Sequence, residues 1–477
     1  MNGFSHFTAV PEASRLKMIA ANLAEYEGQA LDLHWITKTQ ALKADEDRKN
    51  CLTDISQAVE LMFHQTKPKL GPLSPGCVIC GEGGWSCLFI NGKCNCRCFY
   101  CPTSQDETGV PTTNRISFDK PSDYADYVKY FDFKGVSISG GEPLLTLDRT
   151  LKHLKAVRDK MGDSLHLWLY TNGTLLTREI VQMLKDEGLN EIRFDISARE
   201  YDLEKLQMTV GQIPVVTVEI PAIPEDMEKV ASLLSVLYDV GVNHLNLHQL
   251  RLTPHNVVNL KSRNYTFLHG DKVTVLESEL MVLKLMETSL SKGVKLPINY
   301  CSYVYKHRFQ RAAARKRSAR FILKEYESLT ESGFIRTMAL IGDAQALKQK
   351  ADQLTAQGAG SHLFHLTGNK TCLYFHEQLW HLMDFPACDL QLGYSEAVLS
   401  PGVSYRHAFK EVWVNPAKKI VIERQVHCSK LLLSHEQRLV FEKGVICREP
   451  ETRNTDACLN SPFAMFEFIT SGLQQYF

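Results

Sequence analysis

Short apolar runs separated by helical stretches dominate the first half of the chain. The runs cover residues 88–91, 135–139, 165–171, 191–196, 214–220 and 244–250. Among the segments between them, residues 178–187 and 225–240 show the clearest helical periodicity. Alternating strands and helices form βαβ units, which build a parallel sheet with right-handed crossovers. We therefore predict an α/β fold with a partial or full (β/α) barrel, whose active site is made by loops at the C-terminal ends of the strands.

Different patterns flank this region. Residues 11–65 have helical spacing, and residues 67–76, rich in Pro and Gly, predict a linker. Beyond the barrel, residues 336–341 and 412–414 indicate strands, and residues 344–354 indicate a helix. We expect a helical N-terminal extension over residues 1–72 and a barrel domain with a cysteine-rich entry over residues 73–302. An α+β C-terminal domain over residues 303–477 is a candidate for binding the substrate.

The composition is that of an ordinary globular protein. The 477 residues include 54 Lys and Arg and 54 Asp and Glu, so no global charge imbalance points to nucleic acid or an anionic membrane. Residues 1–10 lack a secretion signal, and no run of about 18 apolar residues predicts a membrane span. We expect a cytoplasmic protein without a membrane partner.

Cysteines are concentrated at the start of the barrel region. Seven of the 14 lie between Cys77 and Cys101, and in a reducing compartment such a cluster binds metal more often than it forms disulfides. Cys94, Cys98 and Cys101 form a CxxxCxxC pattern just after the first predicted strand. Three thiolates on one loop can hold three irons of a four-iron cluster and leave the fourth iron open for chemistry.

The loop after the second predicted strand reads Ser-Gly-Gly-Glu-Pro over residues 139–143. Gly140 and Gly141 allow a backbone to approach a ligand closely. The carboxylate of Glu142 and the free carbonyls beside it are suited to accept hydrogen bonds from an ammonium group. The Gly-Gly-Glu-Pro loop lies one predicted strand after the cysteine loop, and this position makes the motif a specific indication of a binding site.

The pattern Cys-Asn-x-x-Cys-x-Tyr-Cys over residues 94–101, followed by Gly-Gly-Glu-Pro, resembles the radical S-adenosylmethionine (radical SAM) superfamily, specifically the pyruvate formate-lyase activating enzyme type. The resemblance spans residues 86–250 and implies a barrel of radical SAM type. It implies that Cys94, Cys98 and Cys101 ligate a [4Fe–4S] cluster whose open iron is chelated by the amino and carboxylate groups of S-adenosylmethionine. It also implies binding of that cofactor by the loops: Tyr100 near the adenine, and Gly140, Gly141, Glu142 and Pro143 around the methionine ammonium.

The same resemblance extends to the ends of later strands. It places Thr171 and Asn172, Asp195 and Ser197, and His248 beside the cofactor, at the ends of the third, fourth and sixth predicted strands. Two of these residues have a purely structural alternative. Asp195 is also a plausible helix N-cap, and His248 a satisfied buried histidine.

Three cysteines upstream are not explained by the family motif. Cys77 and Cys80 form a Cys-Val-Ile-Cys-Gly knuckle, and Cys87 follows a glycine-rich stretch. We predict a possible second metal site from these three, with Cys301 or Cys96 as the fourth ligand. A second Fe–S cluster and a structural zinc both remain open. If Cys96 is not that fourth ligand, it lies inside the motif without binding a metal.

A basic helix is predicted near residues 306–320. Its positive residues are Lys306, Arg308, Arg311, Arg315, Lys316, Arg317 and Arg320. A solvated helix face is the simpler interpretation, and a binding face for an anionic substrate or an RNA is the alternative.

Together these features predict a metal-binding radical SAM enzyme of the oxidoreductase class. It would reductively cleave S-adenosylmethionine to a 5′-deoxyadenosyl radical that abstracts hydrogen from an unknown substrate, for which the basic helix suggests an anion. Its expected electron partner is a one-electron donor such as flavodoxin or ferredoxin. Two alternatives stay open: an activase that generates a glycyl radical on a partner enzyme, and a metal-binding interaction protein that has lost catalysis.

Overall fold

The computed structural model describes residues 10, 12–28, 33–383, 385 and 388–477. The chain divides into two compact units, residues 1–310 with 471–477, and residues 311–470. The predicted N-terminal extension therefore belongs to the same unit as the barrel. The predicted boundary at residue 302 lies close to the observed division after Gln310. In the described part of the chain no helix is long and apolar enough to cross a membrane.

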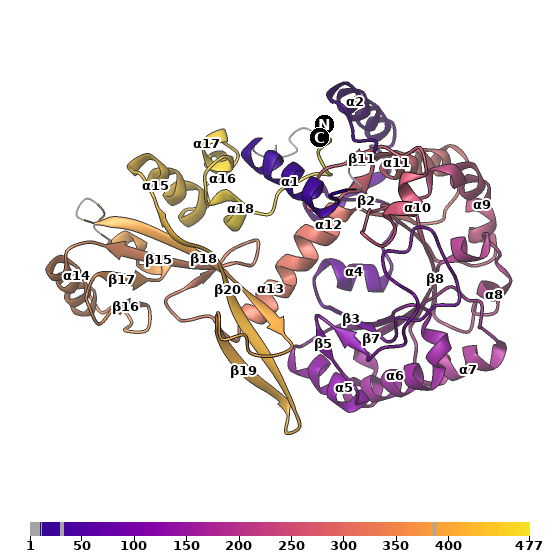
Figure 1. Cartoon of the computed structure of the whole chain (residues 1–477), viewed down its shortest axis with the longest axis horizontal. Coiled ribbons are helices and arrows are strands. Elements are labelled where there is room, and N and C mark those ends of the chain that lie inside the picture. Colours follow the sequence, from indigo (N-terminus) through magenta and orange to yellow (C-terminus); the bar gives the residue numbers. More distant parts are fainter. Residues whose placement is uncertain (1–9, 11, 29–32, 384, 386–387) are drawn as a thin grey trace. The chain divides into compact units, whose positions relative to one another are not determined.

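The first unit is built on a parallel sheet whose strands follow one another in chain order (Figure 1). Each strand is hydrogen-bonded in parallel to the next. These strands are β3 (Trp85–Phe89), β6 (Gly135–Ser139), β7 (His166–Thr171), β8 (Glu191–Phe194), β9 (Val215–Pro221), β10 (His244–His248) and β13 (Ile298–Cys301). The predicted α/β architecture is confirmed, including all the strands expected between residues 88 and 250.

Helices in the crossovers cover the outer face of this sheet (Figure 1). They are α5 (Pro121–Tyr130), α6 (Leu147–Met161), α7 (Arg178–Asp186), α8 (Glu204–Gln207), α9 (Met227–Asp239) and α11 (Leu276–Ser291). Short 3-10 turns lie at η2 (Pro143–Thr146), η3 (Gly162–Ser164), η4 (Ile196–Arg199) and η5 (Pro224–Asp226). Leu154, Leu184 and Leu234 on these helices are fully buried, so the outer layer is an apolar interface.

The sheet is open, which makes it a partial barrel. Antiparallel strands extend both of its ends, and the two end strands, β1 and β5, are not paired with each other in the described chain. Beside β13 lie β2 (Lys67–Leu70) and β1 (Val59–Leu61), and beside β3 lie β4 (Thr112–Thr113) and β5 (Ile116–Ser117). The prediction of a linker over residues 67–76 is thus wrong for β2. Pairing of Lys69 with Asn299, remote in sequence, forms this strand despite Pro68.

The remaining elements of the first unit lie around the sheet. The predicted N-terminal helices are α1 (Glu12–Glu25) and α2 (Lys38–Asp54). The others are α3 (Met62–Gln65), α4 (Pro75–Gly81), α10 (Val257–Lys261), β11 (Phe267–Leu268), β12 (Thr274–Val275), α12 (Tyr303–Tyr305) and the π-helix η6 (Lys306–Gln310). The C-terminal tail returns to this unit, where Arg48 of α2 binds the carbonyl of Gln474 at 2.6 Å and Tyr476 donates to Glu279 at 2.5 Å.

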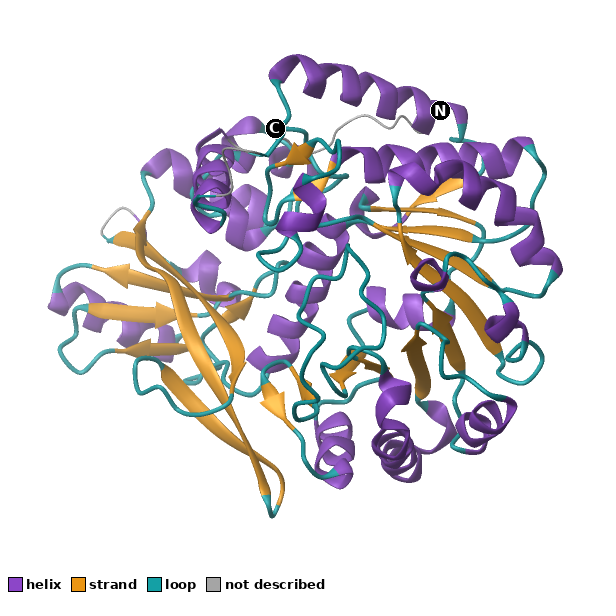
Figure 2. Cartoon of the chain, turned by 45° about the vertical axis from the view of Figure 1, so that its right-hand side comes forward, coloured by secondary structure: helices purple, strands orange, loops and turns teal. Residues whose placement is uncertain are grey.

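The second unit is an α+β fold on a seven-stranded antiparallel sheet (Figure 2). Its strands are β14 (Ser328–Leu329), β15 (Ile335–Ile341), β16 (Phe364–Leu366), β17 (Cys372–Phe375), β18 (Asp389–Ser400), β19 (Ala408–Asn415) and β20 (Lys418–Leu432). Its helices are α13 (Arg311–Ala319), α14 (Ala344–Ala356), η7 (Glu377–Leu382), α15 (His435–Phe441), η9 (Glu442–Ile446), α16 (Pro450–Arg453), α17 (Asp456–Leu459) and α18 (Ala464–Glu467). The apolar core includes Met338, Leu373 and Leu392.

The predicted basic helix is divided between η6 and α13, at the point where the two units divide. Three of its positive side chains make contacts within their own units. Lys306 contacts His248 and Arg308 donates to the carbonyl of Gly472, both in the first unit. Arg315 donates to the carbonyl of Ser332 in the second unit. Arg311, Lys316 and Arg320 are exposed, and both interpretations of this segment, a solvated face and a face that binds an anion, stay predictions.

Candidate functional site

A cavity of about 560 Å³ opens in the first unit at the C-terminal ends of the parallel strands. The strands supply Cys87 from β3, Ser139 from β6, Thr171 from β7, Arg193 from β8, Glu219 from β9, His248 from β10 and Cys301 from β13. The cysteine loop and the glycine loop complete the lining. The cavity thus lies where the strand pattern predicts the site of a (β/α) barrel.

All three motif cysteines line this cavity. The loop is folded by backbone hydrogen bonds, such as the 3.1 Å bond from the amide of Cys101 to the carbonyl of Cys98. The sulfur of Cys94 accepts hydrogen bonds from the amide of Cys96 at 3.4 Å and from Asn172 at 3.7 Å. Burial raises the pKa of the Cys98 thiol to about 12. A metal that binds here therefore has to displace a proton, which couples its affinity to pH.

These three sulfurs do not converge on one point. Among the described residues no three Cys, His, Asp or Glu side chains are arranged to share a single metal ion. A four-iron cluster does not require such convergence, because each thiolate binds a different iron. The donor set, three thiols with hydrogen bonds to sulfur inside one cavity, therefore fits a cluster and not a single ion.

The glycine loop packs tightly against the backbone of the cysteine loop. A β-carbon added at Gly140 would lie 2.3 Å from the carbonyl oxygen of Asn91, and one at Gly141 would lie 2.1 Å from that of Lys93. Gly140 also has φ of 148°, which disfavours other residues. The two glycines thus allow both loops to line the same cavity, side by side.

Glu142 is buried rather than exposed to the cavity. Its side chain is 0% accessible and accepts hydrogen bonds from the Leu144 amide, the Thr171 hydroxyl and the Asn172 amide at 2.8–3.0 Å. Neither Glu142 nor Pro143 lines the cavity. The structure therefore assigns Glu142 to holding the strand β7 loop, and with it Asn172 beside Cys94, instead of receiving an ammonium group directly.

Tyr100, Asp195 and Ser197 form a hydrogen-bonded group beside the cysteine loop. The hydroxyl of Tyr100 lies 2.9 Å from Asp195 and 2.7 Å from Ser197, and Ser197 donates to Asp195 at 2.5 Å. Asp195 occupies the N-cap position of η4. Burial raises its pKa, and the two hydroxyls and the backbone amide of Ala198, in the first turn of η4, oppose that shift. Asp195 thus combines the N-cap position with a place in the cavity lining, and its role beside the cofactor stays a prediction.

His248 faces the cavity with 25% of its side chain exposed. One ring nitrogen is hydrogen-bonded to Glu219, and the other lies 2.6 Å from the ammonium of Lys306. It is therefore a partnered histidine and a cavity residue at once, so the two interpretations from sequence are not exclusive.

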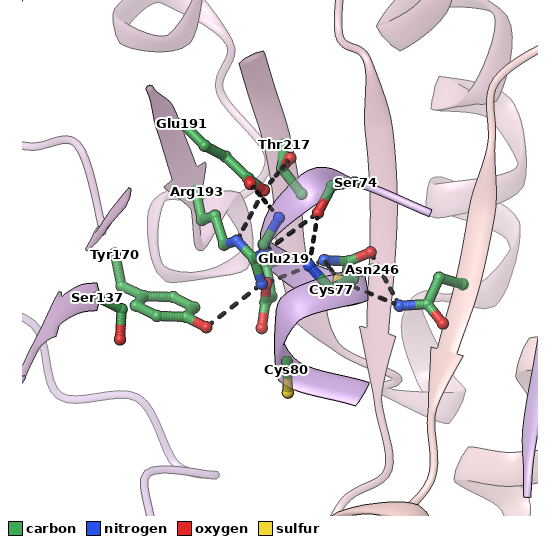
Figure 3. Close-up of polar contacts among 12 residues, drawn as sticks. Ser74, Cys77, Cys80, Ser137, Tyr170, Glu191, Arg193, Thr217, Glu219 and Asn246 are labelled. Carbon is green, nitrogen blue, oxygen red and sulfur yellow. Dashed lines mark hydrogen bonds and ion pairs between the residues drawn. The ribbon is translucent and has the colours of Figure 1, made fainter. Parts of the chain in front are cut away.

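A polar network surrounds the start of α4 (Figure 3), and two of its members, Arg193 and Glu219, also line the cavity. Arg193 is 3% exposed and pairs with Glu191 at 2.8 Å and with Glu219 at 2.6 Å. Despite the opposing effect of burial, Arg193 and its neighbours lower the pKa of Glu191 to about 2 and that of Glu219 well below its usual range. Both carboxylates are thus charged, and each has a charged partner, as buried ions require.

This network anchors α4 inside the sheet. The amide of Gly76 donates to Glu191 at 3.2 Å, and Arg193 donates to Ser74, the N-cap of α4, at 3.1 Å (Figure 3). Sequence reasoning missed these residues, although a signal is present. Polar Glu191 and Arg193 alternate with apolar Ile192 and Phe194 along β8. The two polar side chains therefore lie on one face of the sheet and the two apolar side chains on the other.

Two of the three upstream cysteines lie on α4, and the third lines the cavity. Cys77 accepts a hydrogen bond from Asn246 at 3.3 Å (Figure 3). Cys80 accepts one from Gln310 at 2.7 Å. Cys87 and Cys301 line the cavity instead, as does Cys96. Among the described residues no three Cys, His, Asp or Glu side chains are arranged to share one metal ion, and a structural zinc at these cysteines stays a prediction. A second Fe–S cluster stays a prediction.

Comparison with known proteins decides the family. The Radical SAM superfamily model matches residues 88–212. A Methanocaldococcus jannaschii protein, named as a glycyl-radical enzyme activating enzyme, is 34% identical over 297 residues, which cover 59% of this chain and 77% of that protein. The chain belongs to the radical SAM superfamily. Radical SAM enzymes use a [4Fe–4S] cluster and S-adenosylmethionine, so this protein is a metal-binding enzyme of that kind and not a non-catalytic interaction protein.

Other radical SAM proteins match more narrowly. GTP 3′,8-cyclase of Aliarcobacter butzleri is 34% identical over 113 residues, covering 22% of this chain and 32% of the cyclase. Among solved structures, Streptococcus suis SuiB bound to precursor peptide SuiA is 11% identical with a TM-score of 0.35, covering 45% of this chain and 47% of SuiB. A structure of anSMEcpe with bound AdoMet is 14% identical with a TM-score of 0.34, covering 45% of this chain and 62% of that protein.

Proposed function

We propose that Cys94, Cys98 and Cys101 hold the [4Fe–4S] cluster of this radical SAM enzyme, one iron each, and leave the fourth iron to S-adenosylmethionine. The observation that carries this assignment is that all three thiols line one cavity together with Gly140 and Gly141. When bound, the cluster supplies one electron to cleave the cofactor, and the resulting 5′-deoxyadenosyl radical abstracts hydrogen from a substrate. Hydrogen bonds to sulfur from Asn172 and Cys96 tune the cluster potential.

The surrounding loops bind and orient the cofactor. Gly140 and Gly141 offer backbone carbonyls to the methionine ammonium, at the edge of the cavity next to the cysteine loop. Asp195, held by Tyr100 and Ser197, accepts hydrogen bonds from the ribose side. Thr171 and Asn172 complete the site through the support of Glu142. Fixed groups that orient the cofactor lower the free-energy barrier of the reaction, because the reacting atoms are already in place.

The half of the cavity beyond the cofactor receives the substrate. Its walls include Trp85, Tyr170 and Tyr303, and its positive groups are Arg251 and Lys306. Arg251 lies over the ring of Tyr303 at 5.8 Å, and within the described chain no carboxylate pairs with it. These features support the anionic substrate expected from the sequence. The electron comes from a one-electron donor such as flavodoxin or ferredoxin.

An activase is the second candidate function. The 34% identical relative named as a glycyl-radical enzyme activating enzyme favours it. In that case the group that enters the cavity is a glycine of a partner enzyme.

One anaerobic assay tests the assignment. The protein is reconstituted with iron and sulfide, reduced with dithionite and supplied with S-adenosylmethionine, and 5′-deoxyadenosine is measured by chromatography. Wild type is expected to form it and Cys98→Ala is not. A Cys98→Ala protein that retains both four irons and product formation would overturn the ligand assignment. A glycyl radical EPR signal on a co-incubated partner would select the activase.

A further inference from the structure

Three hydrogen-bond donors of the cavity gather around Tyr303. Arg251 lies over the ring of Tyr303 at 5.8 Å, and the side-chain oxygen of Gln249 accepts from its backbone amide at 2.9 Å. Lys306 follows one helical turn later, and side chains three positions apart on a helix are neighbours. All four residues line the cavity and belong to the first unit. The three donors are thus concentrated in one part of the cavity.

The side chain of Gln249 is fixed with its amide nitrogen unpaired. The backbone amide of Tyr303 can only donate, so the atom of Gln249 that faces it is the oxygen and the nitrogen is left as a donor. Gln249 is 7% exposed, and this nitrogen is buried with no partner among the described residues. A buried donor without an acceptor is destabilising, and an acceptor ligand removes that cost.

The guanidinium of Arg251 has no acidic counter-ion within the described chain. The hydroxyl of Tyr26, which packs in the same apolar cluster as Leu252, is buried without a partner in that part of the chain. Burial raises the pKa of Tyr26, so this hydroxyl stays uncharged. Glu25, next to Tyr26 in sequence, pairs with Lys272 at 2.5 Å. The positive charge of Arg251 is therefore available to a ligand.

Lys306 is held in place by His248 and keeps free donors. The ring nitrogen Nε2 of His248 is hydrogen-bonded to the carboxylate of Glu219, so this nitrogen carries the hydrogen. The other ring nitrogen, Nδ1, then accepts, and Lys306 donates to it at 2.6 Å. An ammonium has three N–H groups, so two remain. His248 thus positions Lys306 and leaves its charge in place.

The acidic side chains that line the cavity have partners of their own. In the described part of the chain they are Asp195 and Glu219. Asp195 accepts from Tyr100 at 2.9 Å, and Glu219 pairs with Arg193 at 2.6 Å. The positive groups around Tyr303 are therefore not neutralised by the lining itself. A partly buried guanidinium and ammonium without carboxylates are suited to carboxylate or phosphate, which a guanidinium binds through two parallel hydrogen bonds.

We propose that Gln249, Arg251 and Lys306 bind an oxyanion of the substrate, a carboxylate or a phosphate group. Arg251 pairs with two oxygens of this group, and Lys306 and Gln249 donate to its remaining lone pairs. Tyr303 supports the site, because its ring carries the guanidinium and its amide fixes Gln249. The inference rests on the proposed function, since the oxyanion belongs to the molecule from which hydrogen is abstracted. A substrate held by its charged group presents one hydrogen to the radical in a fixed orientation.

Labelling of arginines with phenylglyoxal tests the site without turnover. The reconstituted holoenzyme is kept anaerobic with S-adenosylmethionine and without a reductant, and peptide mass spectrometry gives the labelling rate of each arginine. Inorganic phosphate at about 10 mM should slow labelling of Arg251 about 5-fold, as for a Kd of about 2.5 mM. Arg178, exposed on α7 and outside the cavity lining, is the control and should keep its rate. Sodium chloride at equal ionic strength should protect neither arginine.

Succinate in place of phosphate distinguishes the two kinds of oxyanion. Stronger protection by phosphate supports a phosphate group on the substrate, and stronger protection by succinate supports a carboxylate. Lys306→Met should raise the phosphate concentration that half-protects Arg251 about 10-fold, because one charge of the site is lost. Lys152→Met is the matched control, since Lys152 is exposed on α6, and it should leave that concentration unchanged.

Equal slowing of Arg251 and Arg178, or no slowing of either, would overturn the proposal. So would protection of Arg251 by the cluster or by S-adenosylmethionine with no further effect of phosphate or succinate, because the guanidinium would then belong to the cofactor. Formation of 5′-deoxyadenosine separates these failures from failure of the proposed function. A wild-type holoenzyme that forms it without protection of Arg251 loses only the oxyanion site. A cluster-loaded wild type that forms none contradicts the proposed function, whatever the labelling shows.

Discussion

The two halves of the cysteine-rich segment lie in different surroundings. Cys94, Cys98 and Cys101 are on an irregular loop and line the cavity, whereas Cys77 and Cys80 are on α4, inside the sheet, with Asn246 and Gln310 as their hydrogen-bond donors. Cysteines that are neighbours in sequence can therefore have opposite roles. What distinguishes the two sets is the cavity, because Cys94 also accepts hydrogen bonds from the protein, and a thiol that faces a cavity is available to a metal.

The cysteine loop and α4 also differ in the interactions that hold them in place. Backbone hydrogen bonds within residues 91–108 and from the glycine loop shape the cysteine loop. Ion pairs of the sheet interior anchor α4, through Glu191 and Arg193. The comparison predicts that substitutions in the cysteine loop abolish catalysis with little effect on the stability of the fold. Substitutions around α4 are expected to lower stability with less effect on catalysis.

The largest expected effect is on the loop. Replacing Cys94, Cys98 or Cys101 by Ala should reduce 5′-deoxyadenosine formation by more than about 1000-fold, because the cluster loses an iron ligand. Iron content should fall with it, as measured by colorimetric iron analysis. Cys96→Ser is the matched control, since Cys96 contributes its backbone amide to Cys94 and should keep both iron and activity. Activity retained in Cys94→Ala would break the comparison.

Glu191→Gln should have the largest effect on the α4 side. It leaves the buried Arg193 with one charged partner fewer, and such a loss costs about 3–5 kcal/mol of stability. Because the folded-state pKa of Glu191 is lowered to about 2, its stabilisation is present above about pH 5 and is lost as the pH falls toward 2. Hydrogen exchange of α4 amides, measured from pH 3 to 7, should show a steeper dependence in wild type than in the variant, which retains only that of Glu219.

Cys77→Ala should lower the stability of α4 by about 1–2 kcal/mol, because the amides of Asn246 and Asn299 lose their acceptor. Iron and zinc content should stay unchanged, in contrast to Cys98→Ala. Exposed Cys447 is the control, and its replacement by Ala should alter neither quantity. Loss of iron from the Cys77→Ala protein would instead establish the second cluster and place both halves of the segment in metal binding.

The smallest effect concerns the cofactor side of the loop. Tyr100→Phe removes the hydroxyl that bonds Asp195 and Ser197, and each such bond contributes about 1 kcal/mol. The KM for S-adenosylmethionine should rise about 5- to 10-fold while kcat changes little. Exposed Tyr238→Phe should leave both constants as in wild type. A fall in kcat alone would show that Tyr100 acts on the cluster and not on cofactor binding.

Local signals predicted the strands of the barrel and the cluster loop. The apolar runs around β6, β7 and β9 are short and bounded by turns, and they are observed within a few residues of their expected limits. The CxxxCxxC and Gly-Gly motifs depend on residue types that few other structures require. Such features are visible in sequence because their cause lies within a few neighbouring residues.

Features that depend on remote partners were not predicted. β2 contains Pro68 and joins the main sheet through its pairing with β13, and the tail at Gln474 is held by Arg48. Glu142 belongs to a motif that suggests ligand contact, yet the amides of Leu144 and Asn172 bind its carboxylate inside the protein. The direction in which a side chain points and the group that it binds depend on segments remote in the sequence. The local pattern does not contain those segments.

The sequence by itself determined the family and the parallel sheet, and it predicted the three thiols proposed to hold the cluster, because spacing on one loop and periodicity along each strand express them. Only the tertiary structure decided which further residues share the cavity. Cys301, His248 and Glu219 lie on β13, β10 and β9, and parallel pairing brings the C-terminal ends of these strands together. That proximity arises from the register of the sheet, which no local pattern along the chain records.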